Sequence, residues 1–90
     1  AWDALMDRRA DPRLIEGISA IAGGFPGVHG FHDLKTRTAG SRVFVNIHIE
    51  LDGDQSLRDA HAIGAALRRR ILATYPQCDV IIHKDVVRET

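Results

Sequence analysis

The stretch VFVNIHIEL, residues 43–51, alternates aliphatic side chains at its odd positions with Phe44, Asn46, His48 and Glu50 at its even positions. A period of two is typical of a β-strand that buries one face and leaves the other face mostly polar. The stretch therefore predicts a sheet with one covered face and one open face. The segments on either side of it decide what covers the sheet.

Helical signals lie on both sides of this strand. Asp11-Pro12 is typical of a helix start, with Asp as the N-cap and Pro in the first turn, and Gly23-Gly24 ends that helix. Ser56 begins a second helix that runs to about Thr74 and is stopped by Tyr75-Pro76. Its apolar stripe consists of Leu57, Ala60, Ile63, Gly64, Leu67 and Ile71.

Two further strands complete the prediction. Residues 33–38 form a strand that joins the 43–51 strand through a hairpin turn at 38–41, and residues 79–87 are rich in β-branched side chains. We therefore expect an α+β sandwich of ferredoxin-like, metallochaperone-like type in αββαβ order. Its three-stranded sheet carries both helices on one face. Residues 1–10 are too short and too charged for a core of their own and predict a lead-in to a domain formed by residues 11–90.

Length and composition exclude several classes of protein. Ninety residues with 44% apolar side chains suit one small domain, and 12 basic against 12 acidic residues argue against nucleic acid as a partner. No apolar run approaches the roughly 18 residues of a membrane span. A single cysteine, Cys78, excludes an internal disulfide and a multi-cysteine zinc site. The unusual feature is five histidines: His29, His32, His48, His61 and His83.

Three imidazoles and one carboxylate are expected to meet at one end of the polar sheet face. His83 and Asp85 are two positions apart, so both side chains leave the last strand on the same side, beside His48. His32 lies at the start of the first strand. This donor set suits Zn²⁺, and also Fe²⁺, Mn²⁺, Co²⁺ or Ni²⁺. Each residue alone is more often an ordinary solvated side chain, so the hypothesis depends on the group.

The other histidines are less informative. His61 lies one position off the apolar stripe of the second helix, from where it could reach over a sheet edge or across a dimer interface. His29 is interpreted as a solvated bystander. The chain contains no nucleophile elbow, phosphate loop or His-Glu-x-x-His helix, so we expect that it is not an enzyme.

Several short motifs follow one another in a fixed order along the chain. They are GVxGxHDLKTR at 27–37, Gly40, FVxIHIE at 44–50, Ser56-Leu57, Ala60-His61, Tyr75-Pro76 and DVIIHKD at 79–85. In order and spacing they resemble the cytoplasmic C-terminal domain of cation diffusion facilitator transporters, especially bacterial zinc/iron-type members. The lead-in residues 5–8 are similar to the segment that follows the last transmembrane helix in that family.

The resemblance implies a cytosolic homodimer attached to its own transmembrane domain in an inner-membrane transporter, which exchanges divalent metal for protons. The domain would bind metal at the dimer interface and regulate or stabilise the transporter. His32, His48, His83 and Asp85 match the family's ligands, and His61 matches the residue that completes a two-metal site. Zn²⁺ is the expected ion, with Fe²⁺, Cd²⁺ and Mn²⁺ as alternatives. Binding requires neutral imidazoles and is expected to weaken as the pH falls through about 6.5.

Two alternatives remain open from the sequence. The first is a free-standing ferredoxin-like metal chaperone or sensor, which shares the domain but has no transporter attached. The second is a structural dimerisation module whose histidines are incidental. A melting temperature that does not respond to Zn²⁺ would favour the second alternative.

Overall fold

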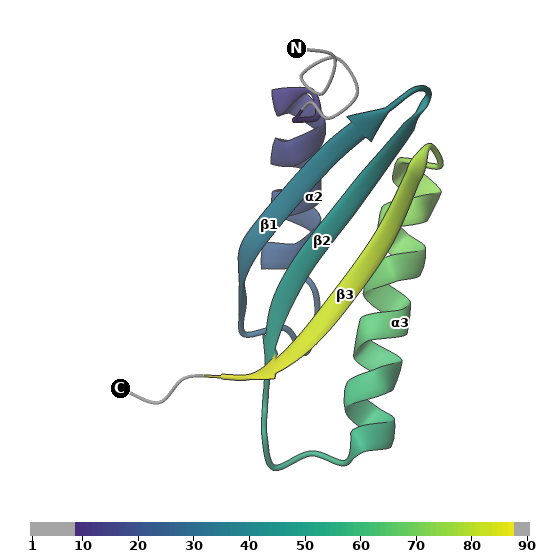
Figure 1. Cartoon of the computed structure of the whole chain (residues 1–90). Coiled ribbons are helices and arrows are strands. Elements are labelled where there is room, and N and C mark those ends of the chain that lie inside the picture. The colour runs from purple at the N-terminus through teal and green to yellow at the C-terminus, as the bar shows by residue number, and fades with distance from the viewer. Residues whose placement is uncertain (1–8, 88–90) are drawn as a thin grey trace.

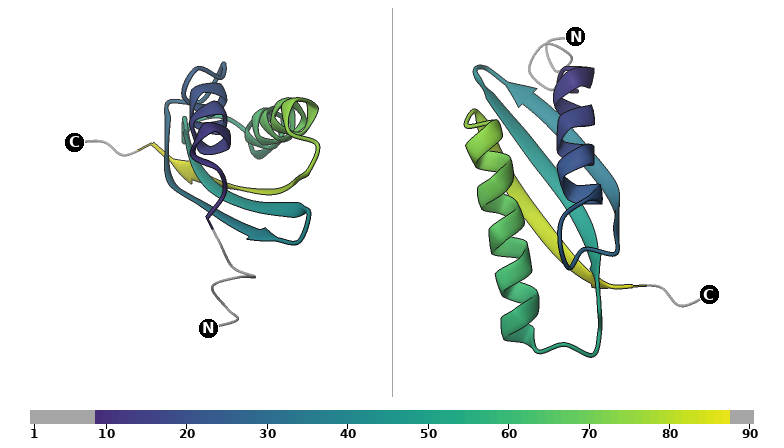
Figure 2. Two further views of the ribbon diagram at one scale, coloured as in Figure 1. Left: turned by 90° about the horizontal axis from the view of Figure 1, so that it is seen from above. Right: turned by 180° about the vertical axis from the view of Figure 1, so that it is seen from behind.

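A computed structural model of the chain describes residues 9–87, which form a three-stranded sheet with two helices on one face (Figure 1). The elements follow the order α2 (Pro12–Gly23), β1 (Gly30–Ala39), β2 (Arg42–Leu51), α3 (Leu57–Thr74) and β3 (Cys78–Val86). In the sheet the strand order is β1-β2-β3, with β1 antiparallel and β3 parallel to β2. Seen from above, α2 and α3 lie side by side on the same side of the sheet (Figure 2). The predicted αββαβ order is confirmed.

The central strand β2 supplies the middle of the core. Its odd-numbered side chains all point toward the helices and are buried, whereas the even-numbered side chains from Phe44 to Glu50 lie half-buried on the open face. The helices contribute Leu14, Ile18 and Ala22 from α2, and Gly64, Leu67 and Ile71 from α3. The alternation in residues 43–51 therefore separates a buried face from an open face, as predicted.

The predicted helix caps are present. The Asp11 side chain accepts a hydrogen bond from the backbone N–H of Arg13 at 2.9 Å, and Ser56 Oγ accepts one from the N–H of Asp59 at 3.0 Å. These bonds satisfy donors that have no partner within the first turn of a helix. Gly40, at φ 61°, makes the tight turn between β1 and β2.

Three details differ from the prediction. β1 begins at Gly30 instead of residue 33, so His32 lies within the strand and not at its start. Leu57 is 82% exposed, because the first turn of α3 extends past the end of the sheet (Figure 1). Ala10, assigned to the lead-in, is buried and its N–H donates to Thr36 Oγ1 at 3.0 Å.

The described part of the chain begins and ends close to the predicted domain boundaries. Residues 1–8 of the predicted lead-in lie outside the described residues. The last strand runs from Cys78 to Val86, one residue earlier at each end than the sequence predicts. Within residues 9–87, no helix is both long enough and apolar enough to cross a membrane.

The lone cysteine belongs to the core. Cys78 is 1% exposed at the start of β3, and burial raises the pKa of its thiol, with Arg42 opposing that shift. A raised thiol pKa contributes stability that is complete at low pH and is lost as the pH rises above the ordinary thiol value. The role of Cys78 is therefore packing.

Candidate metal centre

The sheet register places three histidines in one row across the open face. His32 of β1 pairs with His48 of β2, and His48 pairs with His83 of β3. The rings stack, with centroids 5.1 Å apart for His32 and His48 and 4.3 Å apart for His48 and His83. His48 is thus held between two other imidazoles, one from each neighbouring strand.

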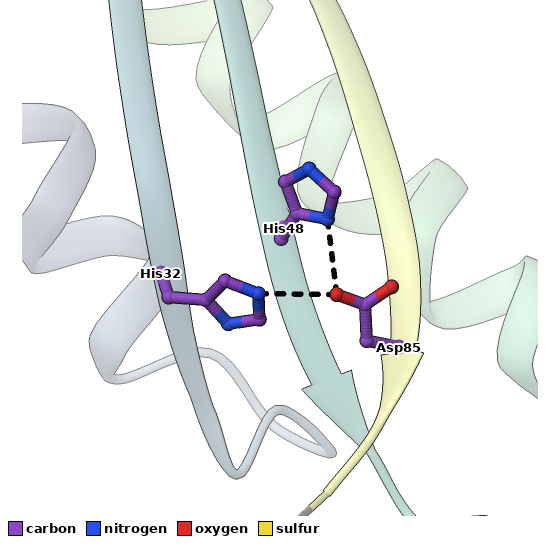
Figure 3. A group of neighbouring side chains, drawn as sticks. All are labelled: His32, His48 and Asp85. Atoms are coloured by element: carbon purple, nitrogen blue, oxygen red, sulfur yellow. Dashed lines mark hydrogen bonds and ion pairs between the residues drawn. The ribbon is translucent and has the colours of Figure 1, made fainter.

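A carboxylate from the next row points back at two of these rings. Asp85 pairs with Glu50 in the β2–β3 register. Its Oδ2 lies 2.9 Å from His48 Nδ1 and 3.1 Å from His32 Nε2, so that one oxygen faces both imidazoles (Figure 3). One donor atom each from His32, His48 and Asp85 lies within 4.8 Å of the others.

A β-bulge brings His32 to this face. Between His32 and Lys35, β1 advances three residues while β2 advances only two, from His48 to Asn46. Asp33 takes a positive φ of 51° at this point, a conformation that Asp adopts more readily than most residues. Without the extra residue, His32 would share a face with Leu34, which packs against the core.

We expect Asp33→Val to lower stability by about 1–2 kcal/mol, because a β-branched side chain opposes the left-handed conformation. The same change is expected to weaken Zn²⁺ binding by disturbing the placement of His32. Asp33→Gly serves as the control, since glycine accepts positive φ without strain. Urea denaturation and Zn²⁺ titration of both variants measure the two effects, and equal stability of Asp33→Val and wild type would contradict this account of the bulge.

The geometry fits a small divalent ion. Tetrahedral Zn²⁺ places its nitrogen and oxygen ligands about 2.0–2.2 Å away, and hence about 3.4 Å from one another. The two contacts to Asp85 Oδ2 are a few tenths of an ångström shorter than this, and small side-chain rotations would open the group to admit the ion. The three side chains are 32–37% exposed, so an ion can reach them from solvent. Three protein donors leave a fourth position for water or for another residue.

Two predicted ligands lie outside this three-atom group. His83 stacks on His48, but its Nε2 contacts Asn46 Oδ1 at 3.1 Å and its side chain faces solvent. His61 is exposed on α3, where it lines a groove of about 460 Å³ with Arg68, Arg69 and Lys84. The lining of that groove contains no carboxylate. The assignment of these residues as ligands stays a prediction.

The fifth histidine is also separate from the group. The side chain of His29 is exposed just before β1, and its backbone N–H donates to the carbonyl of Glu50 at 2.9 Å. It is not among the three clustered donors.

Two further polar residues of β2 contact the histidines, although neither was predicted to have a role in the site. Glu50 Oε2 lies 2.9 Å from His32 Nδ1, on the opposite side of the ring from Asp85, and Asn46 contacts His83. Their even positions in the 43–51 stretch place them on the same face as His48. The alternation in the sequence could therefore have placed Asn46 and Glu50 beside His48. It could not have identified their histidine partners, because these depend on how β2 pairs with β1 and β3.

An open-faced αββαβ sandwich with imidazoles and a carboxylate on its bare face has the layout of a metallochaperone-like domain. Residues 10–86 match the model of a family described as cation efflux protein, cytoplasmic domain. The chain therefore belongs to this family, that of the cation diffusion facilitators, as the sequence motifs predicted.

Individual relatives agree with this assignment. The chain is 45% identical over 85 residues to the cation-efflux pump FieF of Shewanella oneidensis and 38% identical to FieF of an Escherichia coli strain. These matches cover 94% of this chain but only 29% and 28% of the two pumps. The chain thus spans less than a third of the length of these relatives.

Solved structures show the same fold. The metal-bound C-terminal domain of the CzcD transporter from Thermotoga maritima has a TM-score of 0.79 at 30% identity, over 87% of this chain and 92% of that one. A nickel form of a MamM C-terminal domain variant has a TM-score of 0.80 at 20% identity, over 87% and 100%. The ferredoxin-like fold is thereby confirmed.

Proposed function

We propose that the chain is the cytosolic metal-sensing and dimerisation domain of a divalent-cation efflux transporter, and that it acts by binding and not by catalysis. The observation that carries the proposal is the group formed by His32, His48 and Asp85, whose donor atoms converge on the open face within 4.8 Å. Membership of the cation efflux family supplies the context for such a site.

Zn²⁺ is the proposed ion, with Fe²⁺, Cd²⁺ and Mn²⁺ as the alternatives. Two imidazole nitrogens and one carboxylate oxygen are borderline and hard donors, which suit Zn²⁺ and the other first-row divalent ions. No thiolate is near the group, since the only cysteine is buried in the core, and this argues against Cu(I). The CzcD relative, described as metal-bound, supports a metal site on this type of domain.

A homodimer is proposed because His61 faces away from the three-donor group. It lines a groove with Ile82 and Lys84, on the side of β3 opposite Asp85. If His61 is a ligand, it would complete a second metal site between two copies of the chain. An ion that binds the closed dimer more tightly than the open one would shift the population toward closure.

The membrane-related part of the proposal concerns the whole protein. The relatives are about three times longer than this chain, and we propose that the transport pathway lies in a transmembrane domain beyond these 90 residues. The present domain would then lie on the cytoplasmic side of the inner membrane and regulate or stabilise the transporter.

Titration of Zn²⁺ into the 90-residue chain tests the proposal, with His48→Ala/Asp85→Ala as the comparison. We expect saturable binding and a higher melting temperature for the wild type, and neither for the double variant. Small-angle scattering with and without Zn²⁺ is expected to show a dimer that becomes more compact. Equal affinity of the two proteins would refute the site, whereas binding without compaction would refute only the closure model.

A further inference from the structure

We propose that Glu50 and Asn46 are positioning residues that decide which ring nitrogen His32 and His83 present to a metal ion. This inference rests on the proposed metal-binding function. Both residues lie on the open face of β2, two positions either side of His48. Each contacts the outer histidine of a neighbouring strand.

Glu50 acts on His32 from the side away from the donor group. Glu50 Oε2 lies 2.9 Å from His32 Nδ1, and His32 Nε2 lies 3.1 Å from Asp85 Oδ2. A carboxylate can only accept a hydrogen bond, and each nitrogen of the His32 ring faces one. When an ion replaces the direct contact of Nε2 with Asp85, Glu50 keeps the proton on Nδ1 and leaves the lone pair of Nε2 for the metal. This is the carboxylate–histidine–metal arrangement that orients imidazole ligands in many sites.

The position of Glu50 excludes it as a direct ligand to the same ion. The two nitrogens of an imidazole point in diverging directions, and Glu50 faces the nitrogen that is turned away from Asp85 and His48. Accordingly, Glu50 is not among the three clustered donors. Its side chain is only 23% exposed, so water competes less for the bond to His32 than at a fully exposed site.

Asn46 has the corresponding effect on His83. Asn46 Oδ1 lies 3.1 Å from His83 Nε2, so the proton stays on Nε2 and the lone pair is presented by Nδ1. The outer histidines therefore use different nitrogens: Nε2 for His32 and Nδ1 for His83. Because His83 is outside the three-donor group, Asn46 should influence His83 without affecting the first ion.

The experiment combines metal affinity with NMR of the imidazole nitrogens in the 90-residue chain. Glu50→Ala is expected to weaken Zn²⁺ binding by about 10–100-fold. Glu50→Gln keeps an acceptor oxygen and is expected to restore most of the affinity. In the cadmium-loaded wild type, coupling to the metal should appear at His32 Nε2, and in metal-free protein His83 should carry its proton on Nε2.

Asn46 variants and a distant control complete the test. Asn46→Ala should abolish the preference of His83 for the Nε2–H form, and Asn46→Asp, a pure acceptor, should restore it. Glu16→Ala, an exposed carboxylate on α2, is expected to change neither readout.

Metal coupling at His32 Nδ1, or Glu50→Ala affinity within about twofold of wild type, would overturn the role of Glu50. An unchanged His83 tautomer in Asn46→Ala would overturn the role of Asn46. If the wild type binds no metal at all, the proposed function fails, while the tautomer of metal-free His83 still tests the positioning by Asn46.

Discussion

Replacing Asp85 with alanine is expected to lower Zn²⁺ affinity by more than about 100-fold, beyond the 10–100-fold that outer residues of metal sites usually cost. Asp85 supplies the only oxygen of the three-donor group, and its Oδ2 faces both His32 and His48. Without it, two neutral imidazoles remain, with no negative charge to offset that of the ion. Isothermal titration calorimetry measures the loss directly.

The matched control for this experiment is Asp54→Ala. Asp54 is an exposed carboxylate in the loop between β2 and α3, so its removal changes the net charge equally. Its variant is expected to bind Zn²⁺ with wild-type affinity. If Asp85→Ala and Asp54→Ala bind equally well, the ion does not bind at the three-donor group.

The largest expected loss of stability comes from Ile47→Ala, at about 2–5 kcal/mol. Ile47 is fully buried in the central strand, between the sheet and the two helices. Truncation removes apolar contact and leaves a cavity that neighbouring side chains fill only partly. Because small domains have about 5–15 kcal/mol of total stability, the variant should unfold at a much lower urea concentration.

Ile81→Ala is the control for the core substitution. Ile81 carries the same side chain one residue before the β3 partner of Ile47, but it lies on the open face and is 57% exposed. Its truncation is expected to change stability by less than about 0.5 kcal/mol. A similar urea midpoint for both variants would mean that the core does not lie on the helix side of the sheet.

The sequence predicted the fold because its local signals agree with one another. Residues 43–51 alternate between buried aliphatic side chains and half-buried side chains at every position. Asp11 and Ser56 begin the two helices by accepting hydrogen bonds from nearby backbone N–H groups. Such signals depend only on neighbours in the chain. The placement of His48 and Asp85 on the open face followed from the same alternation, once the two strands were assumed to pair.

Features that depend on register were less predictable. The bulge at Asp33 inserts one residue into β1, and a period-two pattern drawn backward from residue 34 would place His32 in the core. The contact of Glu50 with His32 also requires knowing which residues face each other across strands. Leu57 fits the helical stripe, but whether it is buried depends on where the sheet ends.

The three donors come from three different strands, and this has a consequence for folding. His32 lies on one edge strand and Asp85 on the other, with His48 between them. An ion held by all three would be a reversible cross-link between the two edges of the sheet, comparable in its effect on chain entropy to a disulfide that closes a long loop. This cross-link cannot form until β3, which follows α3 in the chain, has paired in parallel with β2. Metal binding would therefore report that the last strand is in its native register.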